Sequence, residues 1–214
     1  MKFGIQPCAV IGHSLGEYAA LAVAGVLSDS DTVFLVGTRA AILKSKCPAY
    51  THGMVSVRAS IANIRHEADG LSFEVACINS PKETVIGGTI NCLDVFATRL
   101  SKAGCSTTRL DLPHAYHTAQ MDDVVDQLIL QTQGITYNKP SIPVMSPQDS
   151  AIINAGACIN PSYLSTSYEG RLILLVLSML RGKLAWCRRP PHGSSWAITL
   201  YAAVLSAAHS LTKA

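Results

Sequence analysis

Residues 8–27 read CAVIGHSLGEYAALAVAGVL, and the pattern of this stretch changes at Gly12. The apolar run from Cys8 to Ile11 predicts a short buried strand that ends at the glycine. The Ala- and Leu-rich run from Glu17 to Leu27 predicts a helix. A strand that a tight turn joins to a helix is typical of an α/β fold.

The turn itself, residues 12–16, reads GHSLG and matches the pattern G-x-S-x-G. This pattern forces the serine into a sharp elbow with an exposed hydroxyl, and the glycines permit close backbone approach. We interpret Ser14 as a nucleophile; the alternative is a Gly-Ser turn with a structural role only. The amide of Leu15 would lie at a helix N-terminus, where it can stabilise an oxyanion. His13 is interpreted as a buried neighbour that shapes the elbow beside the substrate.

A serine nucleophile needs a base. His117 lies in the segment LPHAYH, residues 112–117, between a predicted strand and a predicted helix. The chain re-enters its larger subdomain there, so we expect this side chain to reach the elbow. His114 is the local competitor, and a surface or core role is the alternative for either loop histidine.

Arg39 lies on a predicted helix from Thr32 to Lys46, which follows the N-cap cluster of residues 28–31. All its neighbours at helical spacing are apolar: Leu35, Val36, Ile42 and Leu43. A cation on an apolar face must extend to solvent or find an anion, because an unpaired buried charge is costly. Guanidinium pairs well with carboxylates. We therefore predict that Arg39 receives a substrate carboxylate, with a solvent-directed arginine as the alternative.

Residues 51–113 show a second pattern of short segments. We expect strands at Met54–Arg58, Phe73–Asn79, Thr84–Gly87 and Thr107–Leu112, and helices at Ile61–Ala68 and Cys92–Ala103. Their order, βαββαβ, is that of a ferredoxin-like unit. Residues 51–113 are thus predicted to form a small subdomain inserted into a larger one made of residues 1–50 and 114–164. A helix from Gln120 to Gln131 and a strand from Ile142 to Met145 are expected in the second part of the larger one.

The composition excludes several classes of protein. Hydrophobic residues make up 49% and charged residues 14%, which is typical of a globular chain. The seven cysteines form no C-x-x-C pair, which predicts free thiols and no metal site. Residues 171–214 hold six basic and no acidic residues, spread thinly among apolar runs. No signal peptide and no membrane-length apolar run are evident. We predict a cytoplasmic protein without nucleic-acid or membrane partners.

Four segments together resemble one family. They are GHSLGEYAAL (12–21), AGVLSDSDTVFLVGTRAAIL (24–43), EVACINSPKETVIGG (74–88) and LPHAYHTAQMD (112–122). From residue 3 to about 164 the chain resembles the malonyl-CoA:acyl-carrier-protein transacylase domain of iterative fungal non-reducing polyketide synthases. The resemblance implies an α/β-hydrolase-like large subdomain with the ferredoxin-like insertion. It also implies a Ser14–His117 dyad, a carboxylate-binding Arg39 and an active-site Asn79.

The same resemblance implies the reaction. A malonyl group passes from malonyl-CoA, through an acyl-serine, to the phosphopantetheine thiol of an acyl carrier protein, without bound cofactor or metal. The bulky Tyr116 before the histidine and Leu15 after the serine favour malonyl over methylmalonyl. Neighbouring polyketide synthase domains are implied as partners. A serine hydrolase of the esterase type and a non-catalytic fragment of such a domain are the alternatives.

The chain departs from the family pattern at several places. The large subdomain is expected to be incomplete, because the glutamine loop that usually precedes the serine and the Gly-Pro-rich C-terminal stretch are not recognised. Ser80 stands where glycine is usual and Gly87 where serine is usual. Residues 165–214 form an atypical tail, which a frameshift, a retained intron or a mispredicted gene would produce. We therefore expect the isolated chain to be poorly soluble, with little or no turnover.

Overall fold

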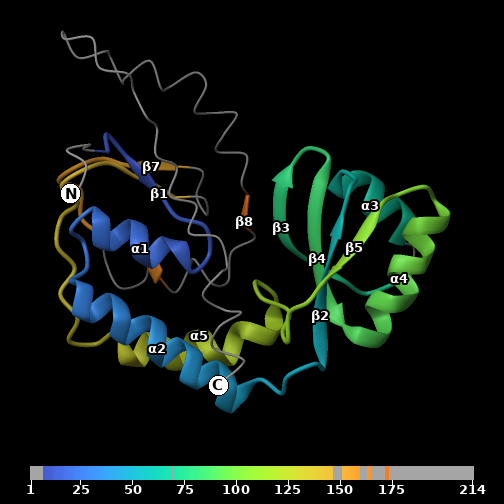
Figure 1. The fold of residues 1–214 in the computed structure, drawn as a ribbon, viewed down its shortest axis with the longest axis horizontal. Coiled ribbons are helices and arrows are strands. Elements are labelled where there is room, and N and C mark those ends of the chain that lie inside the picture. Colours follow the sequence, from blue (N-terminus) through green and yellow to red (C-terminus); the bar gives the residue numbers. More distant parts are fainter. Residues whose placement is uncertain (1–6, 69, 147–150, 160–162, 165–171, 174–214) are drawn as a thin grey trace, which may run out of the picture. The chain divides into compact units, whose positions relative to one another are not determined.

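The computed structural model describes residues 7–68, 70–146, 151–159, 163–164 and 172–173 (Figure 1). The chain forms two compact units. The described part of the first unit is residues 7–36, 135–146 and 151–159. The described part of the second is residues 37–68, 70–134, 163–164 and 172–173. Of the predicted tail, only residues 172–173 lie within the described residues.

The first unit contains the predicted strand, turn and helix. Strand β1 (Val10–Ile11) leads into helix α1 (Gly16–Val23). β1 pairs in parallel with β6 (Val144–Ser146), which pairs antiparallel with β7 (Ala151–Ile153). The strand predicted near Met145 is therefore confirmed, and it lies beside the strand that precedes Ser14. Sequence reasoning missed β7.

The prediction that α1 extends to Leu27 is wrong, because the helix ends at Val23. Gly25 adopts φ 77°, a left-handed conformation that stops a helix. The amides of Gly25 and Val26 donate to the carbonyls of Ala22 and Leu21, each at 2.9 Å. These two bonds are those of a Schellman cap, which satisfies the last carbonyls of the helix.

Helix α2 (Asp29–Lys46) begins three residues before its predicted start. The Ser28 hydroxyl accepts from the Asp31 amide at 3.0 Å, so the first turn is capped by the serine. Asp29 and Asp31 in the first turn and Lys44 and Lys46 in the last complement the helix dipole. α2 runs from the first unit into the second and carries Arg39 in the second.

The second unit follows the predicted order of strand, helix, strand, strand, helix, strand. The elements are β2 (His52–Val57), α3 (Ile61–Ala68), β3 (Glu74–Ser80), β4 (Glu83–Thr89), α4 (Ile90–Lys102) and β5 (Thr107–Leu110). The sheet order is β5-β2-β4-β3-β8, with neighbouring pairs antiparallel except the last. β8 (Leu172–Ile173), which the sequence did not predict, pairs in parallel with β3.

The helix predicted from Gln120 to Gln131 is two elements. A 3-10 turn, η1 (Ala119–Met121), precedes α5 (Asp122–Gln131). The Thr118 side chain accepts from the Gln120 amide and caps η1. The loop that carries His117 therefore ends at the capped start of η1.

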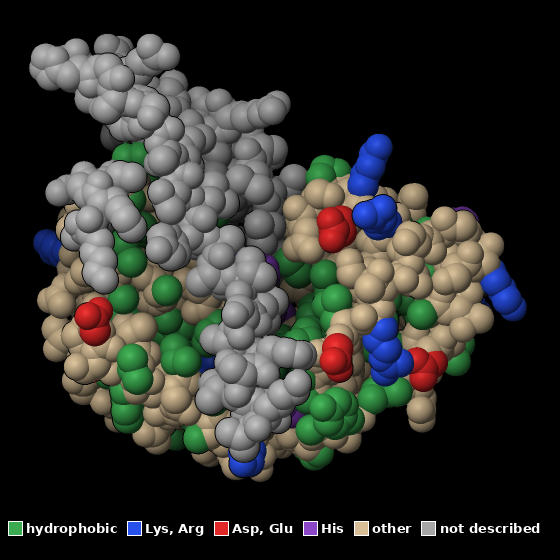
Figure 2. All heavy atoms as spheres, in the orientation of Figure 1, with side chains coloured by type: hydrophobic (Ala, Val, Ile, Leu, Met, Phe, Trp, Pro, Cys, Tyr) green, Lys and Arg blue, Asp and Glu red, His purple; other side chains and the backbone are tan. Residues whose placement is uncertain are grey.

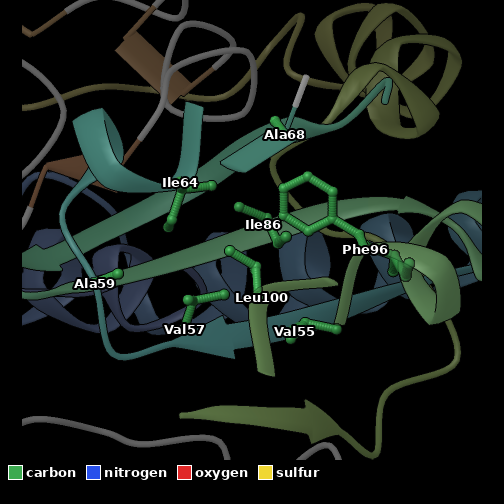
Figure 3. Packing of buried hydrophobic residues seen from close by; sticks show 9 residues of the cluster. Val55, Val57, Ala59, Ile64, Ala68, Ile86, Phe96 and Leu100 are labelled. Carbon is green, nitrogen blue, oxygen red and sulfur yellow. The ribbon is translucent and has the colours of Figure 1, made fainter. Parts of the chain in front are cut away.

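The core of the second unit lies between its sheet and the helices α3 and α4 (Figure 3). Leu93, Phe96 and Leu100 recur at helical spacing on α4 and are all buried. They pack with residues of the sheet and of α3, namely Val55, Val57, Ile64, Ala68 and Ile86. Phe73 adds an aromatic contact, with its ring centroid 4.9 Å from that of Phe96. This packing makes the sheet a stable support for the loops that leave it.

The charges of the second unit are mixed on the face that Figure 2 shows, where Lys and Arg side chains stand among Asp and Glu. Arg109 pairs with Asp94 on this unit. No helix among the described residues combines the length and the apolar character that crossing a membrane requires.

Phe96 gives a test of this core. We expect Phe96→Ala to lower the free energy of unfolding by about 3–5 kcal/mol, because it removes a large side chain that is 1% exposed. The neighbouring Val95 is 54% exposed, so Val95→Ala should change that free energy by about 0.5 kcal/mol or less. Urea unfolding followed by circular dichroism measures both, and equal losses would contradict the assigned core.

Candidate active site

Ser14 lies at the turn between β1 and α1 with φ 53°, in the left-handed region. A residue with a Cβ atom adopts this conformation at a cost of about 1–3 kcal/mol, so its surroundings must impose it. At Gly12 an added Cβ would lie 2.2 Å from the Gly16 carbonyl oxygen and 2.4 Å from the Glu17 amide nitrogen. Only glycine permits this approach, and the sharp turn predicted for G-x-S-x-G is confirmed.

Two hydrogen bonds close the elbow. The Gly16 amide donates to the His13 carbonyl at 2.9 Å, and the Glu17 amide donates to the Ser14 carbonyl at 3.0 Å. Neither uses the amide of Leu15, which occupies the N-cap of α1. That amide is therefore placed at the positive end of the helix dipole, as an oxyanion donor requires.

His13 is half-buried, and burial lowers the pKa of its imidazole. The ring therefore remains neutral near pH 7. The residue is thus only partly buried, and its role as a neighbour that shapes the elbow stays a prediction.

Sequence reasoning missed Glu17. Its side chain is 2% exposed in the first turn of α1, directly after the G-x-S-x-G segment. A carboxylate is favoured at the N-terminus of a helix. Because Glu17 is buried and follows Ser14 closely in the sequence, we regard it as part of the elbow. The available signal was the acidic residue placed immediately after the second glycine of the motif.

In the second unit Arg39 is 8% exposed on α2. The alternative in which this side chain extends into solvent is therefore wrong. Tyr116 packs against a cluster of residues from the end of α2, from η1 and from α5, namely Ile42, Leu43, Cys47, Met121 and Val124. Burial raises the pKa of the Tyr116 phenol, while the Arg39 guanidinium partly opposes that shift. Arg39 and Tyr116, predicted separately, thus lie within electrostatic range of each other.

Asn79 lies near the end of β3, half-buried. Its Oδ1 accepts from the Cys77 thiol at 2.8 Å. Burial, together with the charge of Glu83, raises the pKa of Cys77 to about 12. The thiol therefore keeps its proton at physiological pH, which makes Cys77 a constant donor that orients the Asn79 amide.

His117 lies on the loop between β5 and η1 with φ 60°, again in the left-handed region. Its residue is half-buried, whereas His114 is 6% exposed. Burial lowers the pKa of His114, and its ring meets Tyr116 edge-on at a centroid distance of 5.9 Å. Among the described residues, no group hydrogen-bonds to the buried His114 Nδ1. By the exposure of the whole residue His117 is the less buried of the two loop histidines, while the Nδ1 atoms of both rings are buried.

By unit, Ser14, His13 and Leu15 belong to the first, and Arg39, Asn79, Tyr116 and His117 belong to the second. Within the part of the chain that the structure describes, no three His, Cys, Asp or Glu side chains gather as metal ligands would.

Residues 1–159 match the family described as the acyl transferase domain. The chain belongs to this family. It is 71% identical over 169 residues to a non-reducing polyketide synthase of Penicillium aethiopicum, gsfA, covering 79% of this chain and 9% of the relative. It is 57% identical over 163 residues to the non-reducing polyketide synthase PKS19 of Phaeosphaeria nodorum, covering 76% of this chain and 9% of the relative.

Solved structures of acyltransferase domains have a similar fold. The domain from the second module of the salinomycin polyketide synthase matches with a TM-score of 0.74 and 30% identity, over 84% of this chain and 42% of that one. The domain of an iterative polyketide synthase in enediyne biosynthesis matches with a TM-score of 0.75 and 31% identity, over 84% and 48%. The chain thus spans about 9% of the curated relatives and less than half of these domains.

The two departures from the family pattern have structural counterparts in this acyl transferase domain. Ser80 ends β3, and its hydroxyl accepts from the Lys82 amide at 3.2 Å, which closes the turn toward β4. Gly87 lies in β4, where an added Cβ would meet the Thr118 methyl group at 2.6 Å. The missing side chain at position 87 therefore makes room for the loop that carries His117.

The protonated, buried Cys77 predicts a pattern of thiol reactivity. At pH 8 we expect iodoacetamide to label the exposed Cys8 and Cys158 at least about 10-fold faster than Cys77, because the thiolate is the nucleophile. Peptide mass spectrometry measures the three rates. Denaturant should abolish the difference, and rapid labelling of Cys77 in the folded protein would contradict the assigned donor role.

Proposed function

We propose that this chain transfers a malonyl group from malonyl-CoA to the phosphopantetheine thiol of an acyl carrier protein in polyketide biosynthesis. The left-handed Ser14 at the β1–α1 turn is the observation that carries the proposal, in a chain that belongs to the acyl transferase family. A further relative in structure is a malonyl-transacylase complexed with a type II polyketide synthase acyl-carrier protein, at 25% identity and a TM-score of 0.75. That complex supports both the malonyl group and the carrier-protein partner in this proposal.

The proposed mechanism has two half-reactions. His117 takes the proton of the Ser14 hydroxyl as its oxygen attacks the malonyl thioester, and the Leu15 amide donates to the oxyanion. The intermediate collapses, and the coenzyme A thiolate leaves with the proton from His117. The carrier-protein thiol then gives its proton to His117 and attacks the malonyl-serine ester. Collapse returns the proton to Ser14 and releases malonyl carrier protein.

The choice of His117 over His114 has structural support. A general base must reach its proton directly or through one water molecule, and the half-buried His117 meets that demand better than a nearly enclosed ring. Burial and the lowered pKa of His114 agree with a packing role beside Tyr116.

Substrate selection is assigned to the second unit. Buried Arg39 supplies a guanidinium with which a malonyl carboxylate can form a bidentate, charge-assisted pair. Tyr116 is proposed to limit the room beside the acyl carbon, which favours malonyl over branched units. Asn79, oriented by the Cys77 thiol, and His13, beside the nucleophile, are proposed to contact the bound acyl group.

The finer architectural assignments are also proposals. The strand order β5-β2-β4-β3 with α3 and α4 supports the ferredoxin-like small subdomain, residues 51–113. The parallel β1–β6 pair before the elbow supports an α/β-hydrolase-like large subdomain, residues 1–50 and 114–164. Neighbouring synthase domains as partners, the cytoplasmic location and the absence of a bound cofactor stay predictions.

The nucleophile and base are tested together in the full-length protein. Ser14→Ala should abolish the covalent malonyl adduct formed with malonyl-CoA, whereas Ser80→Ala, the matched control, should retain it. His117→Ala should slow acylation by about 100-fold or more, the usual scale for losing a general base, and His114→Ala should have a smaller effect. Intact-mass kinetics measure all four variants. An adduct that persists in Ser14→Ala contradicts the nucleophile, and release of free malonate at the rate of acylation favours a hydrolase.

Arg39 is tested by comparing two acyl groups. Arg39→Ala should lower the kcat/KM for malonyl-CoA by about 100-fold, since a desolvated charged pair contributes several kcal/mol, while acetyl-CoA loses nothing. Acetyl lacks the carboxylate, so it serves as the internal control. Equal losses for both substrates, measured by acyl-enzyme formation, would assign Arg39 a structural role.

A further inference from the structure

The loop that carries His117 rests on β4 at one buried position, Gly87. A Cβ atom added there would lie 2.6 Å from the Thr118 Cγ2 atom and 3.2 Å from the Ala115 Cβ atom. These two neighbours lie on either side of His117 in the sequence. Because Gly87 has no side chain, Ala115 and Thr118, on the two sides of His117, can both pack against the backbone of β4 at this position.

The loop is also tied to itself. The Thr118 hydroxyl donates to the Ala115 carbonyl at 2.6 Å, and the Ala115 amide donates to the Gln120 side-chain oxygen at 2.8 Å. Together these bonds bracket His117 within one closed turn. Both branches of the Thr118 side chain therefore hold the loop: the hydroxyl donates the hydrogen bond within the turn, and the methyl group packs against Gly87.

The sheet holds the turn from a second side. Glu74 of β3 pairs in register with Gly87 of β4, and its carboxylate accepts from the Ala119 amide at 2.9 Å. The Cys47 thiol donates to the Gln120 carbonyl at 3.2 Å. The turn is thereby fixed to α2 and to two neighbouring strands.

These hydrogen bonds and contacts surround His117, whose backbone is in the left-handed region with φ 60°. A residue with a side chain is held in that region only when its surroundings over-determine it. Thr118 directly follows His117, so the contacts that fix Thr118 also restrain the backbone of His117.

We propose that Gly87 and Thr118 form a matched steric pair that positions His117 for proton transfer. The inference rests on the proposed function, in which His117 is the base. Both are positioning residues and neither touches the substrate. The pair also gives a physical reason for glycine at position 87: a side chain there would force Thr118 to move.

The test is a rescue experiment in the full-length protein, with malonyl-CoA as the acyl donor. Gly87→Ala should lower the single-turnover rate of Ser14 acylation by about 10- to 100-fold, the scale of a displacement near 1 Å, with little change in the half-saturating concentration. Gly88→Ala is the matched control, because its Cβ would meet only Leu93 at 3.8 Å. Its rate should stay within about twofold of the parent rate.

The double variant Gly87→Ala/Thr118→Ser decides the cause. Serine keeps the hydroxyl that bonds to Ala115 but lacks the methyl group that meets the new Cβ, so the double variant should recover most of the lost rate. Thr118→Ser alone should lose less rate than Gly87→Ala, because it removes a methyl contact without adding a clash. No recovery, or a Gly87→Ala rate equal to that of Gly88→Ala, would overturn the proposal.

His117→Ala separates this inference from the proposed function. If His117→Ala acylates normally, the assignment of the base fails; if it is slow while Gly87→Ala is normal, only the positioning inference fails. The thermal midpoint of each variant shows whether it is folded. Should Gly87→Ala not fold, the double variant Gly87→Ala/Thr118→Ser still decides the cause. A folded double variant with acylation near the parent rate supports the proposal, and a double variant that also fails to fold overturns it.

Discussion

The left-handed backbone of Ser14 is the constraint on which the account depends. It exists because Gly12 lets the start of α1 approach so closely that no Cβ fits. The two hydrogen bonds of the turn then hold the helix N-terminus under the serine. The close approach also places the Leu15 amide at the N-terminus of α1, where it suits the proposed attack of the Ser14 hydroxyl on an acyl carbon.

A left-handed backbone also occurs in the second unit, at a second residue that we assign to the reaction. His117 is also held at a positive φ, and there the restraints come from a sheet instead of a helix. The core between the sheet and its helices α3 and α4 makes that sheet a fixed reference. Tyr50, the other non-glycine residue with positive φ among those described, donates its amide to the Pro113 carbonyl at 2.7 Å and ties the approach to β2 to the same loop. In the part of the chain that the structure describes, the strained non-glycine residues are thus Ser14, His117 and a residue bonded to the loop of His117.

Much of this could be predicted from sequence because it is local. The elbow lies within one pentapeptide, and the alternation of short apolar runs gave the element order of residues 52–110. The end of α1 was missed because a Schellman cap at Gly25 overrides the helical propensity of the alanines around it. The burial of Glu17 and the bond between Cys77 and Asn79 depend on packing, which periodicity does not report. The contact between Thr118 and Gly87 joins residues far apart in the sequence. The sequence alone showed only that position 87 departs from the pattern of the resemblance.

A crystal structure of the protein after brief reaction with malonyl-CoA would show which side chain carries the acyl group. We predict a malonyl ester on the Ser14 oxygen, with Ser14 still in the left-handed region. Its carbonyl oxygen should lie about 2.7–3.1 Å from the Leu15 amide nitrogen. An acyl group on any other side chain, or a Ser14 that has relaxed to negative φ with its carbonyl turned away from that amide, would contradict it.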